Sequence, residues 1–197
     1  SAKLNSEFPT VHRNLAIAYF NKNNNPAFAL KSLEKAFELD KTDSRVLYEL
    51  DQLYQKLNRT PQERLENLEK YRKLVNERDD MTLEFITLLN LNNKFEEALQ
   101  LLESRKFHPW EGGEGKVTGQ YVYTHVELAK KAIQQKKFNT AIELLNKTVK
   151  YPHNLGEGKL HGAQENDVHY YFGCAYEGVE DLENADKCFE LASVGLD

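Results

Sequence analysis

Apolar residues recur three and four positions apart along most of this chain, which is the spacing of one face of an α-helix. Five such stretches are each followed by a second one, and the turns between them are short and polar, as in "NRTP" and "NNKF". The pattern therefore predicts an all-α protein built from five helix-turn-helix pairs. The first helices are expected at residues 12–19, 47–54, 82–89, 125–132 and 169–176, and the second ones at 29–36, 64–71, 98–105, 141–148 and 185–192.

The second helices share an internal pattern. An anchor residue, usually Ala, is followed by an apolar residue four positions later and, in most cases, by a small or apolar one after seven, as in "ALKSLEKA" (29–36). The anchors stand at positions 29, 64, 98, 141 and 185, so successive anchors lie 35, 34, 43 and 44 residues apart. A period of about 34 residues is typical of stacked units, none of which can bury its apolar face alone.

In spacing and residue type the units resemble tetratricopeptide repeats (TPRs). The resemblance implies a right-handed superhelical array of about five units and a single domain over residues 1–197. Its repeats would cover about residues 10–43, 44–78, 79–112, 122–155 and 166–197. The fifth unit shows the family pattern most fully, with Phe172-Gly173, Tyr176, Ala185, Phe189 and Ala192 where Leu-Gly, Tyr, Ala, Phe and Ala are expected.

The second and third units depart from this pattern. Asp51 and Ile86 stand where a small residue is usual, and Arg64 replaces the anchor Ala. We expect these helix pairs to pack less closely than the fourth and fifth pairs.

Two glycine-rich insertions account for the two long steps. "PWEGGEGKVTGQY" (109–121) and "PHNLGEGKLHGAQEND" (152–167) both contain Gly-Glu-Gly-Lys, followed by an apolar residue, one further residue and Gly. They fall within residues 107–121 and 151–167, between the second helix of one repeat and the first helix of the next. Since packed helices lie about 10 Å apart, we expect both insertions on one edge of the array, forming a composite patch.

The insertions carry candidate binding residues. Glycines leave backbone N–H groups free, and a neighbouring lysine completes a concave site for an anion, while a tryptophan suits a sugar or another flat ligand. The alternative is a structural role, in which the glycines only turn the chain, the lysines cap a helix or pair with a glutamate, and the tryptophan fills a gap. The candidates are Trp110, Gly113, Glu114 and Lys116 in the first insertion, and Gly156, Glu157, Lys159 and His161 in the second.

A second candidate surface is the exposed face of the first helices, which in TPR proteins commonly holds a partner peptide. Tyr123, Lys130 and Tyr170 are its main candidates. Lys130 is the only basic residue on the projected face, so the carboxylate clamp that holds chaperone tails is not expected. The full projection comprises Asp80, Leu83, Thr87, Asn90, Tyr123, Val126, Lys130, Ile133, Asp167, Tyr170 and Cys174.

Enzymatic chemistry has no support in the sequence. The Gly-Glu-Gly-Lys stretches lack the GxxxxGK[ST] pattern and the preceding strand of a nucleotide-binding loop. His153, His161 and His169 do not follow a known zinc spacing. We expect a non-enzymatic protein with no metal site and no cofactor.

Charge and composition exclude some classes of binding partner. The net charge of -5 argues against non-specific nucleic-acid binding, and no apolar run reaches the length of a membrane span. Two cysteines without a CxxC pair fit a reducing compartment, for which we expect the cytoplasm. The chain begins with Ser1 and ends just after the fifth pair, so we expect a fragment with an exposed apolar end, covered by dimerisation or by the rest of the protein.

Two functions from different classes remain open. One is a non-catalytic TPR scaffold that docks a protein, a peptide or another part of its own chain. The other is the binding of a small anionic or carbohydrate ligand by the paired insertions. The insertions are similar to the C-terminal end of large bacterial proteins in which a mutarotase-like domain of unknown function precedes TPR units.

Overall fold

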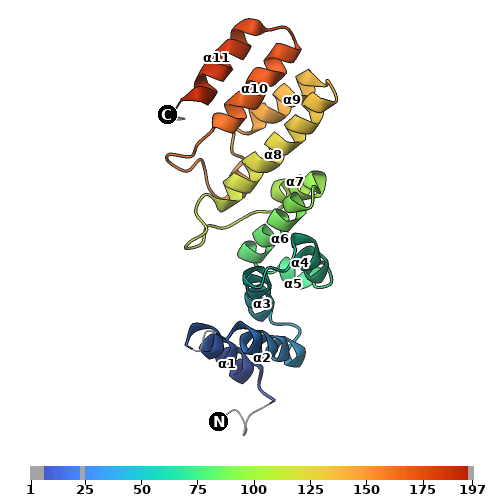
Figure 1. The fold of residues 1–197 in the computed structure, drawn as a ribbon, viewed down its shortest axis with the longest axis vertical. Helices are drawn as coiled ribbons and strands as arrows, with labels where there is room; N and C mark the ends of the chain where they lie inside the picture. The colour runs from blue at the N-terminus through green and yellow to red at the C-terminus, as the bar shows by residue number, and fades with distance from the viewer. Residues whose placement is uncertain (1–6, 23–24, 195–197) are drawn as a thin grey trace. The chain divides into compact units, whose positions relative to one another are not determined.

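All regular structure in the described residues, 7–22 and 25–194, is helical in the computed structural model (Figure 1). The chain forms two compact units, residues 1–88 and 89–197, and each is described by itself. Helix α6 begins in the first unit and ends in the second. The helices of the first unit are α1 (Pro9–Asn21), α2 (Pro26–Leu39), α3 (Ser44–Lys56), α4 (Pro61–Glu69), α5 (Arg72–Val75) and α6 (Asp79–Leu91). The second unit adds α7 (Phe95–Ser104), α8 (Lys116–Gln134), α9 (Phe138–Lys147), the 3-10 turn η1 (His153–Leu155), α10 (Asn166–Gly178) and α11 (Leu182–Ser193).

Local sequence signals set where the helices of the first unit begin. Proline occupies the first turn of α1, α2 and α4, where its missing N–H breaks no helical hydrogen bond. Thr60 and Glu63 form a capping box at the start of α4. Helix α4, the second helix of the second pair, begins three residues before the predicted start at 64 and ends at Glu69, two residues before the predicted end at 71. Tyr71 lies between α4 and α5, and its ring packs edge-on against Phe37 at 4.9 Å.

One turn geometry joins the helices of the second to fifth pairs. Its central residue has a left-handed backbone, at Asn58, Asn93, Lys136 and Glu180. The next residue donates its N–H to the carbonyl five positions earlier, for example from Arg59 to Tyr54 and from Asp181 to Tyr176, both at 3.0 Å. This Schellman-type arrangement satisfies carbonyl groups that a helix end leaves without partners. The turn therefore comes five or six residues before the anchor residue of each of these pairs.

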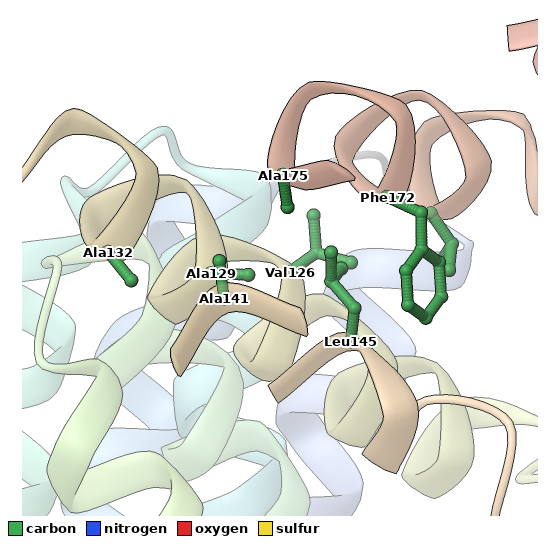
Figure 2. Close-up of a cluster of buried hydrophobic side chains, with 8 residues drawn as sticks. Val126, Ala129, Ala132, Ala141, Leu145, Phe172 and Ala175 are labelled. Carbon is green, nitrogen blue, oxygen red and sulfur yellow. The ribbon is translucent and has the colours of Figure 1, made fainter. Parts of the chain in front are cut away.

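Small side chains let the helices of the second unit pack closely. Figure 2 shows side chains of α8, α9 and α10 meeting in one buried cluster. Gly173 on α10 lies under the ring of Phe189 on α11, and Gly178 lies under the ring of Phe138 on α9, so close that a Cβ atom would fall within 2.4 and 2.2 Å of ring carbons. The cluster comprises Val126, Ala129, Ala132, Ala141, Leu145, Val168, Phe172 and Ala175.

The second pair packs less closely than the fourth and fifth pairs, as expected, since α3 and α4 approach each other in far fewer places than α8 and α9 or α10 and α11. Asp51 on α3 and Arg64 on α4 form a two-point salt bridge, with contacts of 3.1 and 2.6 Å. Both side chains are buried, at 0 and 3 % exposure, and Arg64 also contacts Glu84 at 2.6 Å. The two departures from the repeat pattern therefore compensate each other, because the buried ion pair bridges two helices that approach each other less closely than small residues would allow. Ile86, the third departure, is fully buried.

The fifth pair ends in partly apolar surface. Leu182, Leu191 and Val194 at α11 are exposed, and the side chain of Asn166 donates to the carbonyls of Ala192 and Val194 at 2.8 and 2.7 Å. Residues 195–197 lie outside the described residues. The predicted coverage of this end by a second copy or another domain stays a prediction.

The Asp51–Arg64 pair makes a testable prediction about stability. Arg64→Ala leaves a buried carboxylate without its main partner, and burial already raises the pKa of Asp51 in spite of Arg64. We expect a loss of about 3–5 kcal/mol in the free energy of unfolding. Asp51→Ala combined with Arg64→Ala removes both charges and should cost less than the sum of the single changes by at least about 1 kcal/mol.

Urea unfolding followed by circular dichroism measures all three variants. The exposed pair Glu183–Lys187 on α11 is the control, and Lys187→Ala should change stability by no more than about 1 kcal/mol. Strict additivity of the Asp51 and Arg64 effects would contradict the compensation.

Candidate functional site

The two insertions lie side by side in the second unit, at the N-terminal ends of α8 and α10 (Figure 1). The N–H of Phe107 in the first donates to the carbonyl of Asn154 in the second at 2.7 Å. Phe107, Val117 and Leu155 are buried between them. The spacing of the insertions correctly predicted that they meet, although they are more than 40 residues apart in the sequence.

The second insertion closes the C-terminal end of α7. The side-chain amide of Asn154 donates to the carbonyls of Leu102 at 2.7 Å and Arg105 at 2.8 Å. The last carbonyl groups of a helix have no partners within the helix and carry partial negative charge. This partly buried amide donor therefore satisfies them and ties the end of α7 to the second insertion.

Glu157 of the second insertion closes the N-terminal end of α8. Its carboxylate accepts the N–H groups of Gly115 at 2.8 Å, Val117 at 3.0 Å and Thr118 at 3.1 Å. The N–H of Lys116 is taken by the carbonyl of Gly113. The sequence predicted an anion-binding concavity of glycine N–H groups here, and the group that occupies it is a carboxylate of the same chain.

The two Gly-Glu-Gly-Lys stretches have different backbones and different roles. In the first, the second glycine, Gly115, has a φ of +73° and precedes α8, whereas in the second it is the first glycine, Gly156, that has a φ of +76°. Glu114 is exposed and accepts the N–H of Gly112 at 3.3 Å. The glutamate in the corresponding position of the second stretch, Glu157, is the helix cap. The shared Gly-Glu-Gly-Lys sequence therefore does not give the two insertions the same backbone structure.

Trp110 serves packing inside its own insertion. Its indole lies against Gly113, where a Cβ atom would fall 2.2 Å from the ring. A cavity of about 270 Å³ adjoins it, lined by His108, Pro109, Trp110, Glu111, Gly113, Glu114, Val117, Leu155 and Glu157. Four predicted site residues, Trp110, Gly113, Glu114 and Glu157, therefore share one cavity.

A second cavity, of about 320 Å³, lies between the second insertion and the first turns of α8. The ammonium group of Lys159 pairs with Glu165 inside it at 2.6 Å. Leu160 packs against Gly115 and forms part of the wall. The remaining lining residues are Thr118, Gly119, Val122, Tyr123, Tyr151, Ala163, Gln164 and Asp167.

The exposed face of α8 and α10 continues from this second cavity. Tyr123, 42 % exposed, belongs both to the cavity and to this face. Lys130, two turns further along α8, pairs with Glu127 at 2.6 Å and lies 5.4 Å from the ring centre of Tyr171 on α10. The neighbouring ring of Tyr170 is 50 % exposed. The hydrogen bond to Glu127 raises the pKa of Lys130, and partial burial together with the Glu127 carboxylate raises the pKa of Tyr123.

Three residues predicted to lie on this kind of face are instead buried. They are Leu83, Asn90 and Val126. Asn90, at the end of α6, donates to Gln120 at 2.8 Å and to Thr124 at 2.9 Å, so it ties α6 to α8 inside the second unit. Helical periodicity places a residue on a face, but the width of the buried stripe depends on the neighbouring helices.

Trp110, Lys116 and Lys159 do not converge on one pocket. Trp110 lines the first cavity, Lys159 lines the second, and Lys116 is exposed and lines neither of them. His161 is also exposed. Among the described residues, no group of three or more His, Cys, Asp or Glu side chains is arranged to hold a metal ion, and no helix has the length and apolar character needed to cross a membrane.

Solved structures of TPR proteins share this fold, and no protein-family model matches the sequence. YrrB, described as a TPR protein with an unusual peptide-binding site, aligns with a TM-score of 0.60 and 18 % identity over 97 % of this chain and 88 % of its own. The MamA protein aligns with a TM-score of 0.58 and 17 % identity over 95 % of this chain and 91 % of its own. MamA 41-end from Desulfovibrio magneticus RS-1 aligns with a TM-score of 0.56 and 17 % identity over 93 and 92 %. The fold is thus that of TPR proteins.

Replacing Glu157 tests its role as a cap. In Glu157→Gln an amide group faces backbone N–H donors where a carboxylate oxygen accepted them. We expect a loss of about 1–2 kcal/mol in the unfolding free energy and faster hydrogen exchange at the amides of Gly115, Val117 and Thr118. Trp110 fluorescence during urea unfolding gives the first quantity. Glu114→Gln is the matched control and should be nearly neutral, and equal effects of the two changes would argue against the cap.

Two glycines of the second insertion give a sharper comparison. Gly156→Ala forces a positive φ on alanine and places its Cβ 2.5 Å from the carbonyl oxygen of Phe107. We expect it to cost about 2–3 kcal/mol. Gly158→Ala meets no atom within 4 Å and should change stability by less than about 0.5 kcal/mol. Thermal unfolding followed by Trp110 fluorescence compares the two, and a neutral Gly156→Ala would show that the insertions do not pack as described.

Proposed function

We propose that this protein is a non-catalytic interaction scaffold whose exposed face of α8 and α10 binds a protein or peptide segment. The observation that carries the proposal is a pair of half-exposed tyrosines on adjacent helices, Tyr123 on α8 and Tyr170 on α10. The ammonium group of Lys130 on α8 lies 5.4 Å from the ring centre of Tyr171, the ring next to Tyr170. Tyrosine supplies a large contact area and one hydrogen-bonding group, and it is enriched where interfaces have their strongest contacts.

The fold favours this use of the face. Helix-turn-helix repeats present the exposed faces of successive first helices next to one another, and an extended or helical segment fits along them. YrrB, one of the similar TPR structures, is described as having a peptide-binding site. We extend peptide binding to this chain as part of the proposal, with either another protein or a further part of the same chain as the partner.

The alternative function, binding of an anionic or carbohydrate ligand by the paired insertions, is less favoured. Glu157 already occupies the N–H groups that an external anion would use, and Lys116 and Lys159 do not share a cavity. The association with a mutarotase-like domain stays a prediction, since the compared structures bear on the repeat fold alone.

The proposal includes a reducing compartment and a partner other than nucleic acid. Cys174 and Cys188 are free thiols. The net charge of -5 does not provide the basic surface on which nucleic-acid binding depends.

Selection of peptides from a randomised phage-displayed library tests the proposed function. Enriched peptides, labelled and titrated with the full chain by fluorescence anisotropy, should lose affinity at least about tenfold with Tyr123→Ala and with Tyr170→Ala. Leu182→Ala on α11 is the control, because Leu182 is exposed but lies outside the face, and it should leave affinity unchanged. Failure to enrich any peptide, or equal affinity in all variants, would overturn the proposal.

A further inference from the structure

The cavity between the second insertion and α8 has an excess of acidic groups. Its charged lining residues are Lys159, Glu165 and Asp167. Burial is the main cause of the raised pKa of the neighbouring Tyr151; the Glu165 carboxylate adds to it and Lys159 opposes it. Two carboxylates therefore face one ammonium group in the cavity. An entering cation is therefore favoured over an entering anion.

The chain itself places an ammonium group in this cavity. Lys159 pairs with Glu165 at 2.6 Å, and the two side chains are 44 and 23 % exposed. An ion pair at such exposure contributes only weakly to stability. Lys159 is thus a cation of the chain itself that occupies the cavity. A cation from a partner can displace it from Glu165, or can bind beside it with Asp167 as a second carboxylate.

The walls of the cavity suit the long stem of a basic side chain. Leu160, 51 % exposed, and Tyr123 present apolar surface at the cavity. Lys and Arg side chains bury their methylene stems against such surface and keep the charged group at a polar end, and both bind the faces of tyrosine rings. The carboxylates of Glu165 and Asp167 supply that polar end.

The cavity is continuous with the proposed peptide-binding face. Tyr123 belongs to both, and Asp167 lies in the first turn of α10, one turn before Tyr170. A segment lying across Tyr123 and Tyr170 therefore passes the mouth of the cavity, and one of its side chains is positioned to enter it.

We propose that this cavity binds a lysine or arginine side chain of the partner segment, held between Glu165, Asp167 and the ring of Tyr123. The inference rests on the proposed function, because it names the kind of residue that the partner must carry. The proposed occupant is a basic peptide segment. The experiment must distinguish it from the opposite case, an acidic segment bound by Lys159.

A small probe tests the cavity without any selected peptide. N-acetyl-arginine methylamide is titrated into the full ¹⁵N-labelled chain, with N-acetyl-norleucine methylamide and N-acetyl-glutamate methylamide as comparisons. We expect the arginine probe alone to shift the amide signals of Gly119, Tyr123, Ala163 and Gln164. No shift with the arginine probe, or a larger shift with the glutamate probe, would overturn the inference.

Two variants give opposite expected results. Glu165→Gln should weaken binding of the arginine probe, whereas Lys159→Met should strengthen it by about threefold, because a competing internal cation is removed. Lys116→Met is the matched control from the other Gly-Glu-Gly-Lys stretch and should have no effect. Weaker arginine binding in Lys159→Met would also overturn the inference. An unchanged amide signal of Phe107, which donates to the carbonyl of Asn154 outside this cavity, shows that the insertions remain folded in each variant.

The selected peptides separate failure of the inference from failure of the proposed function. Peptides that bind in a Tyr170-dependent way but lack Lys and Arg, or that are insensitive to Glu165→Gln, overturn only the inference. Failure to enrich peptides, together with a positive arginine titration, overturns the proposed function and shows a cavity for basic groups that serves no peptide-binding face.

Discussion

The carboxylate of Glu157 at the N-terminal end of α8 is the interaction on which the arrangement of the second unit depends. It satisfies the N–H groups of Gly115, Val117 and Thr118, and three residues earlier Asn154 satisfies carbonyls at the end of α7. The acceptor Glu157 thus faces the partial positive charge at the start of α8, and the donor Asn154 faces the partial negative charge at the end of α7. Because both helix ends are fixed, the residues between them hold the walls of two cavities in place.

The two copies of the Gly-Glu-Gly-Lys sequence have different structural roles. The first stretch supplies the backbone groups to be capped, and the second supplies the cap. Gly156 lies so close to the carbonyl of Phe107 that a side chain would not fit, whereas Gly158 has open space around it. The glycines are therefore not equivalent, and sequence similarity between two loops says little about whether either of them binds a ligand.

The sequence was sufficient to predict the repeat fold, since periodic apolar positions are local features that each pair carries and four of the five anchors are alanines. It also placed the two insertions next to each other. It was not sufficient where a residue's role depends on a partner far along the chain. Asp51 and Arg64 looked like separate defects, and only their contact shows that they form one buried pair. Glu157 was a candidate ligand-binding residue, and nothing local reveals that its partners lie near residue 116.

Under the proposed function, the insertions also change what the repeat surface is able to recognise. Without the insertions, two neighbouring first helices would present only a shallow surface. On it, Tyr123 and Tyr170 would provide contact area but would select weakly between different partner segments. The second insertion adds depth at one end of that face, with carboxylates at Glu165 and Asp167 and apolar surface at Leu160. Specificity requires a feature that penalises the wrong partner, and an acidic cavity penalises a segment that offers it an acidic side chain. A scaffold thus gains selectivity from residues that its repeat pattern does not need.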